Sequence, residues 1–279
     1  MKPQILISAV TAGSGKTLFT MGLLRALKNR GMKVQPYKCG PDFIDSQYLS
    51  IAADKESINL DAWMSSSTHT QHIYNRYGEQ ADACIIEGTA ALFDGYRRMQ
   101  GSSAEIASIL NLPVVLLVNA RMAGYSVAPL LYGYKHFYSG VHIAGVIFNQ
   151  VSSPAHYAHL REACSDTGLD CLGYLPVMEG FKLSPKHNAI SLANRRIIDE
   201  QANLIASQIE KHEICSTFLS KLESLGYLSN GEKLIPLLPD FLKEDKYNEG
   251  YMAQLSAAIQ NKQPFYNDDI TELANAINT

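Results

Sequence analysis

The sequence has few cysteines and few charged residues for its length. Only five of its 279 residues are cysteine, an odd number, and no two of them form a Cys-x-x-Cys pair. This spacing argues against a disulfide framework and against a cysteine-based zinc site. Charged residues make up 18 % and the formal net charge is −3, without a basic stripe. This balance excludes a disordered chain, and we expect no nucleic-acid partner.

Long apolar runs are absent as well. No run approaches the roughly 18 residues that span a bilayer. The N-terminus begins with a strand-like run rather than with a charged and then apolar signal pattern. We therefore expect a cytoplasmic protein with no membrane partner. Hydrophobic residues make up 46 %, and the chain is long enough to bury a full core.

Short apolar runs alternate with amphipathic stretches over the first 200 residues or so. Several runs are continuously apolar, as in residues 114–118, which favours strands covered on both faces. The alternation predicts an α/β fold, with a mainly parallel sheet and helices on both faces. We expect an α/β domain over residues 1–210 and a mainly helical appendage over residues 211–279. The predicted strands are 4–9, 33–38, 83–87, 113–119, 143–149 and 171–175, and the predicted helices are 16–29, 69–76, 102–110, 156–167, 200–212 and 214–225.

A phosphate-binding loop follows the first predicted strand. Residues 9–17 read Ala-Val-Thr-Ala-Gly-Ser-Gly-Lys-Thr and open a predicted helix. In such a loop, backbone N–H groups bind phosphate oxygens, the lysine reaches the β and γ phosphates and the threonine ligates Mg²⁺. The small residue in place of the first glycine is Ala9, one position early, as in a deviant branch of P-loop proteins. The predicted nucleotide-binding residues of the loop are Ala12, Gly13, Ser14, Gly15, Lys16 and Thr17.

Acidic residues follow two other predicted strands. Glu87 ends one of them and Asp42 comes shortly after another. Ligands gather at the carboxyl ends of parallel strands, and Mg²⁺ takes one or two carboxylates beside phosphate oxygens. We therefore predict ATP and Mg²⁺ as cofactors, with Thr17, Asp42 and Glu87 at the metal. The alternative for either carboxylate is a helix cap or a solvated loop residue.

Two further segments carry a more specific signal. Residues 38–45 read Lys-Cys-Gly-Pro-Asp-Phe-Ile-Asp and are followed by Asn-Leu-Asp at 59–61, and residues 87–95 read Glu-Gly-Thr-Ala-Ala-Leu-Phe-Asp-Gly. With the phosphate loop, these segments resemble the ATP-dependent amidase domain of the cobyrinic acid a,c-diamide synthase family. Related families with the same deviant loop are cobyric acid synthase and dethiobiotin synthetase. The resemblance extends to about residue 200.

The resemblance implies a dethiobiotin synthetase-like fold, a homodimer, and ATP-dependent amidation of tetrapyrrole carboxylates. A substrate carboxylate would attack the γ-phosphate, and ammonia would capture the acyl phosphate. Phosphoryl transfer relies on positioning and charge stabilisation, which suits these residue types. By resemblance, the catalytic residues are Lys16, Lys38, Asp45, Glu87 and Asp94, the substrate contacts are Asp42, Asp45, Ser102 and Ser103, and Asn149 contacts the nucleotide base.

The family's glutaminase domain has no counterpart in this sequence. Such a domain needs a cysteine nucleophile on a glycine-rich elbow, and none of the five cysteines has that setting. We therefore expect ammonia from solution or from a separate glutaminase. The motifs that the family uses for its substrate also differ in this sequence. His187 matches a histidine of the family, but the residues around it do not match. The acceptor is therefore open to another tetrapyrrole or another polycarboxylate.

Two other functions remain open. A dethiobiotin synthetase-like ligase would close a ring with CO₂, although residues 40–45 argue against it. A partition-type dimeric ATPase would switch partner binding, but residues 11–14 lack its signature lysine. The role of the three closely spaced tyrosines at 132, 134 and 138 is open too. They fit core or interface packing, or a wall for a flat macrocycle.

Overall fold

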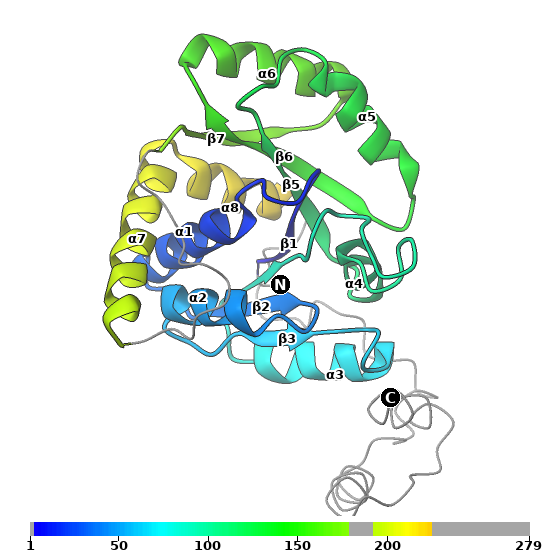
Figure 1. Cartoon of the computed structure of the whole chain (residues 1–279), viewed down its shortest axis with the longest axis vertical. Coiled ribbons are helices and arrows are strands. Elements are labelled where there is room, and N and C mark those ends of the chain that lie inside the picture. The colour runs from blue at the N-terminus through cyan, green and yellow to red at the C-terminus, as the bar shows by residue number, and fades with distance from the viewer. Residues whose placement is uncertain (1–2, 179–191, 225–279) are drawn as a thin grey trace, which may run out of the picture.

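A seven-stranded parallel sheet forms the centre of the molecule, in the order β3-β2-β4-β1-β5-β6-β7 (Figure 1). The computed structural model describes residues 3–178 and 192–224. Every pair of neighbouring strands is parallel, so all strands end at the same edge of the sheet. The strands are β1 (Gln4–Ala9), β2 (Val34–Cys39), β3 (Ile58–Leu60), β4 (Ala83–Glu87), β5 (Pro113–Asn119), β6 (His142–Val151) and β7 (Cys171–Pro176).

Helices cover both faces of this sheet, as predicted. Leu6 and Ile86 point to a core shared with α3, α4, α5 and α6, whereas Ile5 and Ile85 point to a core shared with α1, α2, α7 and α8. Successive strand residues face opposite sides, so two covered faces require continuously apolar strands. The helices are α1 (Lys16–Asn29), α2 (Phe43–Ala53), α3 (Ser67–Gly78), α4 (Ser103–Ile109), α5 (Val127–Phe137), α6 (Pro154–Thr167), α7 (Leu192–Lys211) and α8 (Ile214–Ser224).

The sequence pattern does not predict α2, β3 or α5. The Gly-Pro pair before α2 suggests only a turn, and buried Asp45 and Ser46 weaken the apolar period of the helix. Strand β3 has three residues and pairs with β2 at the edge of the sheet. Helix α5 contains Pro129 and Gly133, which lower helix propensity, although a proline is tolerated in the first turn. The secondary structure of these three segments therefore depends on their contacts with the rest of the fold.

Helices α7 and α8 pack into the same core as α1. Buried residues of both helices, Ile205, Phe218 and Leu222 among them, lie in one apolar cluster with Leu23. Helix α7 begins at Leu192 rather than at the predicted residue 200. Most of the predicted appendage, together with His187, lies outside the described residues, so the division at residue 210 stays a prediction.

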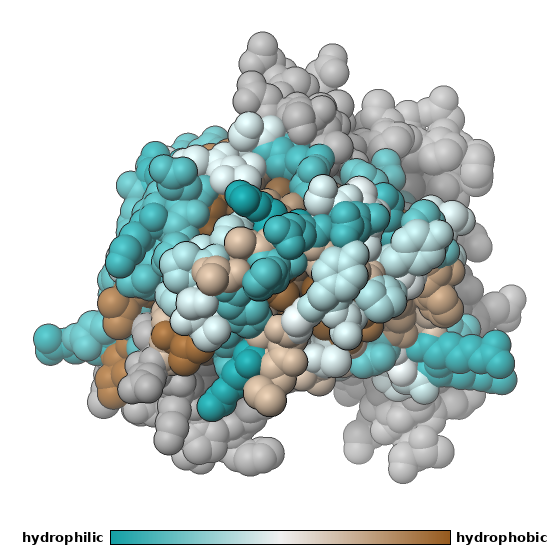
Figure 2. Space-filling view, turned by 90° about the horizontal axis from the view of Figure 1, so that it is seen from above, coloured by the Kyte–Doolittle hydropathy of each residue, from teal (hydrophilic) through white to brown (hydrophobic). Residues whose placement is uncertain are grey.

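Seen from above, the surface of the molecule mixes hydrophilic and hydrophobic side chains (Figure 2). Leu130 and Tyr132 of α5 are among the exposed apolar residues, at 43 % and 57 %. Within residues 3–178 and 192–224, no helix combines the length and the apolar character that a bilayer crossing requires.

Gly22 lets α1 and α7 approach closely. An ideal Cβ at this position lies 2.3 Å from Ile205 Cγ2 and 2.9 Å from Ile209 Cδ1. Gly22→Ala is therefore expected to lower the free energy of unfolding by about 1–2 kcal/mol, because overpacking outweighs the better helix propensity of alanine. Urea unfolding measures this change.

Gly133→Ala is the matched control in α5, because its ideal Cβ has no neighbouring heavy atom within 4 Å in the described chain apart from the adjoining residues and its own helix backbone. That variant is expected to gain up to about 1 kcal/mol from helix propensity. Stabilisation by both substitutions would contradict the close packing of α1 on α7.

Candidate active site

The phosphate loop joins β1 to α1 at the carboxyl edge of the sheet. Gly13 and Gly15 have φ of 75° and 93°, a conformation that favours glycine. Asn149, near the end of β6, donates from Nδ2 to the Ser14 carbonyl at 2.8 Å. An ideal Cβ at Gly15 lies 2.4 Å from the same Nδ2 atom. Asn149 therefore fixes the loop from beside Gly15, and its contact with a nucleotide base stays a prediction.

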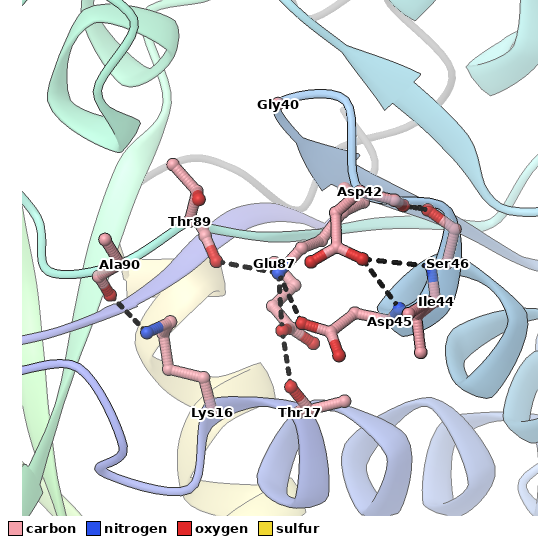
Figure 3. Close-up of polar contacts among 12 residues, drawn as sticks. Lys16, Thr17, Gly40, Asp42, Ile44, Asp45, Ser46, Glu87, Thr89 and Ala90 are labelled. Carbon is pink, nitrogen blue, oxygen red and sulfur yellow. Dashed lines mark hydrogen bonds and ion pairs between the residues drawn. The ribbon is translucent and has the colours of Figure 1, made fainter. Parts of the chain in front are cut away.

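Lys16 and Thr17 begin α1 and point toward the end of β4 (Figure 3). The Lys16 ammonium donates a hydrogen bond to the Ala90 carbonyl, and this lysine is only 8 % exposed. The Thr17 hydroxyl donates to Glu87 Oε1 at 2.8 Å. The structure thus brings together the lysine, the threonine and one of the two acidic residues that the sequence places at the phosphates and the metal.

Lys38 is the centre of a buried charged cluster. Strands β2 and β4 are neighbours, and Lys38 lies directly opposite Glu87 in their register. The ammonium lies 2.8 Å from Glu87 Oε1 and 3.2 Å from Asp45 Oδ2, and it donates to the Gly88 carbonyl at 3.1 Å. The Lys38, Glu87 and Asp45 side chains are 2 %, 0 % and 6 % exposed. Two buried carboxylates therefore share one ammonium beside the phosphate loop.

Burial is the largest influence on the pKa values of Lys38, Glu87 and Asp42. It lowers the pKa of the Lys38 ammonium, but the charges of Glu87 and Asp45 outweigh it and raise that pKa overall. Burial also raises the pKa of the Glu87 carboxyl, against the opposing effects of Lys38 and Thr17. For Asp42, burial is outweighed by the Asp45 backbone N–H and by Lys38, so its pKa is lowered. Lys38 therefore stays charged at neutral pH.

Glu87 has an oxygen suited to a metal ion. Its Oε2 atom is fully buried and has no hydrogen-bond partner among the described residues. Such an atom is costly unless a ligand or water contacts it. Carboxylate and hydroxyl oxygens are the donors that Mg²⁺ prefers, and Glu87 and Thr17 present both kinds. No cluster of three or more His, Cys, Asp or Glu suited to a metal occurs in the described part of the chain. A Mg²⁺ ion here would therefore complete its shell with phosphate oxygens and water.

Asp42 shapes the loop between β2 and α2. Its Oδ1 atom caps α2 by accepting from the backbone N–H groups of Ile44 at 3.0 Å and Asp45 at 2.9 Å. Asn59 of β3 donates to the carbonyls of Gly40 at 2.6 Å and Asp42 at 3.2 Å. None of the described contacts joins Asp42 to Thr17 or Glu87, so its predicted roles at the metal and the substrate stay predictions. The capping instead holds Asp45 toward Lys38.

Asp94 and Ser102 lie on the segment between β4 and α4, and Ser103 is the first residue of α4. Asp94 Oδ2 accepts from the Ala91 backbone N–H at 3.3 Å. The Ser102 hydroxyl caps α4 by accepting from the Glu105 N–H at 3.2 Å, and the Ser103 hydroxyl donates to the Thr89 carbonyl at 3.0 Å. Both serines are 0 % exposed, whereas Asp94 is exposed. The serines brace this segment, and their contact with a substrate carboxylate stays a prediction.

Tyr134 contacts the candidate site, although the sequence shows it only as one of several closely spaced tyrosines. Its hydroxyl donates to the carbonyl of Val10 in the phosphate loop at 2.6 Å, and its ring stacks on Phe93 at a centroid distance of 5.4 Å. The tyrosine therefore links α5, the phosphate loop and the segment after β4. Only the tertiary fold reveals this link, because α5 is not predicted from the sequence.

Comparison with known proteins agrees with the geometry. Residues 5–192 match the family of CobQ/CobB/MinD/ParA nucleotide binding domains. Cobyrinate a,c-diamide synthase of Syntrophotalea carbinolica is 34 % identical over 271 residues, covering 96 % of this chain and 57 % of the relative. Hydrogenobyrinate a,c-diamide synthase of Brucella ovis is 36 % identical over 238 residues, covering 83 % of this chain and 54 % of the relative. The chain spans about half the length of these curated relatives.

A solved structure shares the fold. A chain of the MinC:MinD cell division protein complex of Aquifex aeolicus superposes with a TM-score of 0.50 at 13 % identity, covering 84 % of this chain and 99 % of that one. At this identity the likeness concerns the fold alone. The family match covers most of the described chain, including the phosphate loop and the Lys38 cluster. The chain therefore belongs to the CbiA family of CobQ/CobB/MinD/ParA nucleotide-binding domains.

Proposed function

We propose that this chain is an ATP-dependent amidoligase that converts carboxylates of a corrinoid or a similar tetrapyrrole to carboxamides. The observation that carries the proposal is the Lys38, Glu87 and Asp45 cluster at the inner end of the phosphate loop. An ammonium paired with carboxylates is placed there to stabilise charge on a phosphoryl group as it moves. The names of the relatives supply the acceptor class.

The proposed reaction has two steps. A substrate carboxylate oxygen bonds to the γ-phosphorus of ATP while the bond to the bridging oxygen breaks, which gives an acyl phosphate and ADP. Ammonia then bonds to the acyl carbon, phosphate leaves, and the nitrogen loses a proton, which gives the amide. Ammonia comes from solution or from a separate glutaminase, and the active form is a homodimer.

The residues of the cluster and of the phosphate loop have separate tasks in this scheme. Lys16 and the loop N–H groups bind the β and γ phosphates, and Lys38 contacts the transferred group. Thr17 and Glu87 would hold Mg²⁺, which neutralises phosphate charge when bound. Asp45 keeps the Lys38 ammonium directed toward the transferred group and orients the incoming carboxylate or ammonia.

Oxygen transfer tests the acyl phosphate. Cobyrinic acid labelled with ¹⁸O in its carboxylates is incubated with the protein, Mg-ATP and ammonium, and the phosphate is analysed by mass spectrometry. The proposal predicts one labelled oxygen per phosphate released with amide formation. Unlabelled phosphate formed together with amide would exclude the intermediate. ADP release coupled to dimerisation without any acceptor would instead favour the partition-type switch.

Asp45→Asn separates the two ends of the site. This substitution keeps the shape of the side chain but removes the negative charge 3.2 Å from Lys38. We expect amide formation to fall by about 10²-fold, a typical effect of losing a group that acts in the transition state, while the Kd for ATP changes little. Isothermal titration and a coupled ADP assay measure both quantities.

Asp54→Asn is the matched control, because Asp54 ends the same helix at the surface and pairs only with Lys28 among the described ion pairs. It should leave amide formation unchanged. An equal loss of ATP affinity in Asp45→Asn would contradict the division of the site into a phosphate end and a substrate end.

A further inference from the structure

A pocket lies beside the segment that follows β4. Its volume is about 790 Å³, and it is open to solvent. Unlike the Lys38 cluster, the pocket combines aromatic and cationic side chains. It is lined by Phe93, Arg97, Arg98, Met99, Gln100 and Phe137.

A tight hairpin holds the two arginines at the pocket. The Gly95 N–H donates to the Arg98 carbonyl at 2.8 Å, and the Tyr96 N–H donates to the Gln100 carbonyl at 3.0 Å. Arg97 and Gln100 form an antiparallel bridge, and Arg98 has a φ of 55° at the turn. An ideal Cβ at Gly95 lies 2.0 Å from the Gln100 carbonyl oxygen, so the turn requires glycine. The hairpin backbone is therefore fixed without using the arginine side chains.

The chemistry of the lining favours a planar anionic ligand. Arg97 and Arg98 are exposed, and neither has an ion-pair partner within the described ranges. A guanidinium binds carboxylate through two parallel hydrogen bonds. Phe93 and Phe137 meet at a centroid distance of 5.0 Å, and Phe137 is 69 % exposed. The pocket thus offers cations for carboxylates and aromatic surface for an apolar ring.

The pocket is connected to the phosphate loop through short contacts. Phe93 stacks on Tyr134, whose hydroxyl donates to the Val10 carbonyl. The Leu92 N–H donates to the carbonyl of Ala9 at 2.9 Å, and Lys16 donates to the carbonyl of Ala90. The pocket wall and the phosphate loop are therefore parts of one packed unit.

We propose that this pocket binds the acceptor, with Arg97 and Arg98 pairing with its peripheral carboxylates and Phe93 and Phe137 contacting its ring. The inference rests on the proposed function and assigns its substrate-recognition residues. The arginines bind carboxylates that do not react, so they hold the macrocycle while another carboxylate reaches the γ-phosphate. They act on substrate affinity rather than on the chemical step.

Trp63 is a natural reporter for this pocket. It is the one tryptophan of the chain, is 57 % exposed, and lies 5.3 Å from Tyr96 of the hairpin between ring centroids. Corrinoids absorb light strongly, so a bound corrinoid should quench its fluorescence. Titration with cobyrinic acid then gives a Kd without ATP, and a corrinoid whose side chains are all amides tests the contribution of the carboxylates.

The test is the double variant Arg97→Gln and Arg98→Gln. The control is the single variant Arg76→Gln on α3, which removes one positive charge from the surface away from the pocket. The double variant is expected to raise the Kd and the KM for cobyrinic acid by about 10- to 100-fold, the usual loss for charge-assisted hydrogen bonds. The kcat, the KM for ATP and the Kd for the fully amidated corrinoid should stay within about twofold. Arg76→Gln should change none of these values.

The outcomes separate this inference from the proposed function. Amidation with an unchanged KM in the double variant overturns the pocket assignment and leaves the function standing. Equal weakening of the acid and the amide also overturns it. Arginine-dependent binding without amidation supports the pocket and contradicts the function. A wild-type protein that neither binds nor amidates cobyrinic acid contradicts both.

Discussion

Replacing Lys16 by alanine should lower ATP turnover by at least about 10²- to 10³-fold, the effect of removing one preorganised donor from a developing anion. Lys16 begins α1 and is largely buried, with its ammonium at the carbonyl of Ala90. The variant loses this contact and the charge that binds the β and γ phosphates. Turnover is followed by ADP release at saturating acceptor, and ATP affinity by titration calorimetry.

Lys28→Ala is the control, because Lys28 lies at the other end of α1 and forms an exposed pair with Asp54 at 3.2 Å. It should turn over ATP at the wild-type rate. Thermal unfolding shows whether Lys16→Ala remains folded. A folded Lys16→Ala protein with at least a tenth of the wild-type turnover would contradict the assignment of the phosphate loop.

Lys38→Met has the second large effect, and it concerns stability as well as activity. The substitution leaves Glu87 and Asp45 buried without their shared ammonium. Removing one partner of a buried ion pair costs about 3–5 kcal/mol, because the remaining charge is uncompensated. Urea unfolding measures the loss. Lys28→Met should cost no more than about 1 kcal/mol, as expected for an exposed pair.

The Lys38 ammonium also has a defined effect on the pH dependence of stability. The pKa of Lys38 is raised in the folded protein, so its contribution to stability is complete below the ordinary lysine pKa. It is lost only as pH rises through the raised value. Titration of Lys38 should therefore add no pH dependence to the stability of the wild-type protein from pH 7 to about pH 9.5, as urea unfolding at several pH values measures. Adding Glu87→Gln to Lys38→Met should restore part of the stability, since one buried charge is removed. No recovery would contradict the shared ion pair.

The sequence correctly predicts the local elements that carry the candidate site. The phosphate loop lies within nine consecutive residues, and Glu87 ends a strand whose limits match the prediction. The pairing of Lys38 with Glu87 is harder to predict from the sequence, because it depends on β4 lying between β2 and β1 in the sheet. That order is a tertiary property, so the sequence names both residues without placing them opposite each other.

Other parts of the site depend on burial and long-range packing. Ser102 and Ser103 have residue types suited to a ligand, yet both are buried and brace the chain in the structure. Arg97 and Arg98 belong to no recognisable sequence motif. Only the structure shows that a hairpin places them in a pocket beside aromatic side chains. Tyr134 contacts the phosphate loop from α5, and this helix is not predicted from the sequence because it contains a proline and a glycine.

The most direct test of the proposed amidoligase is ADP release by the purified protein with Mg-ATP and ammonium, with and without cobyrinic acid, and with mass spectrometry of the corrinoid. ADP release should depend on the acceptor and match the number of carboxylates converted to carboxamides. ADP release at the same rate without an acceptor, with the corrinoid unchanged, would contradict the proposed amidoligase.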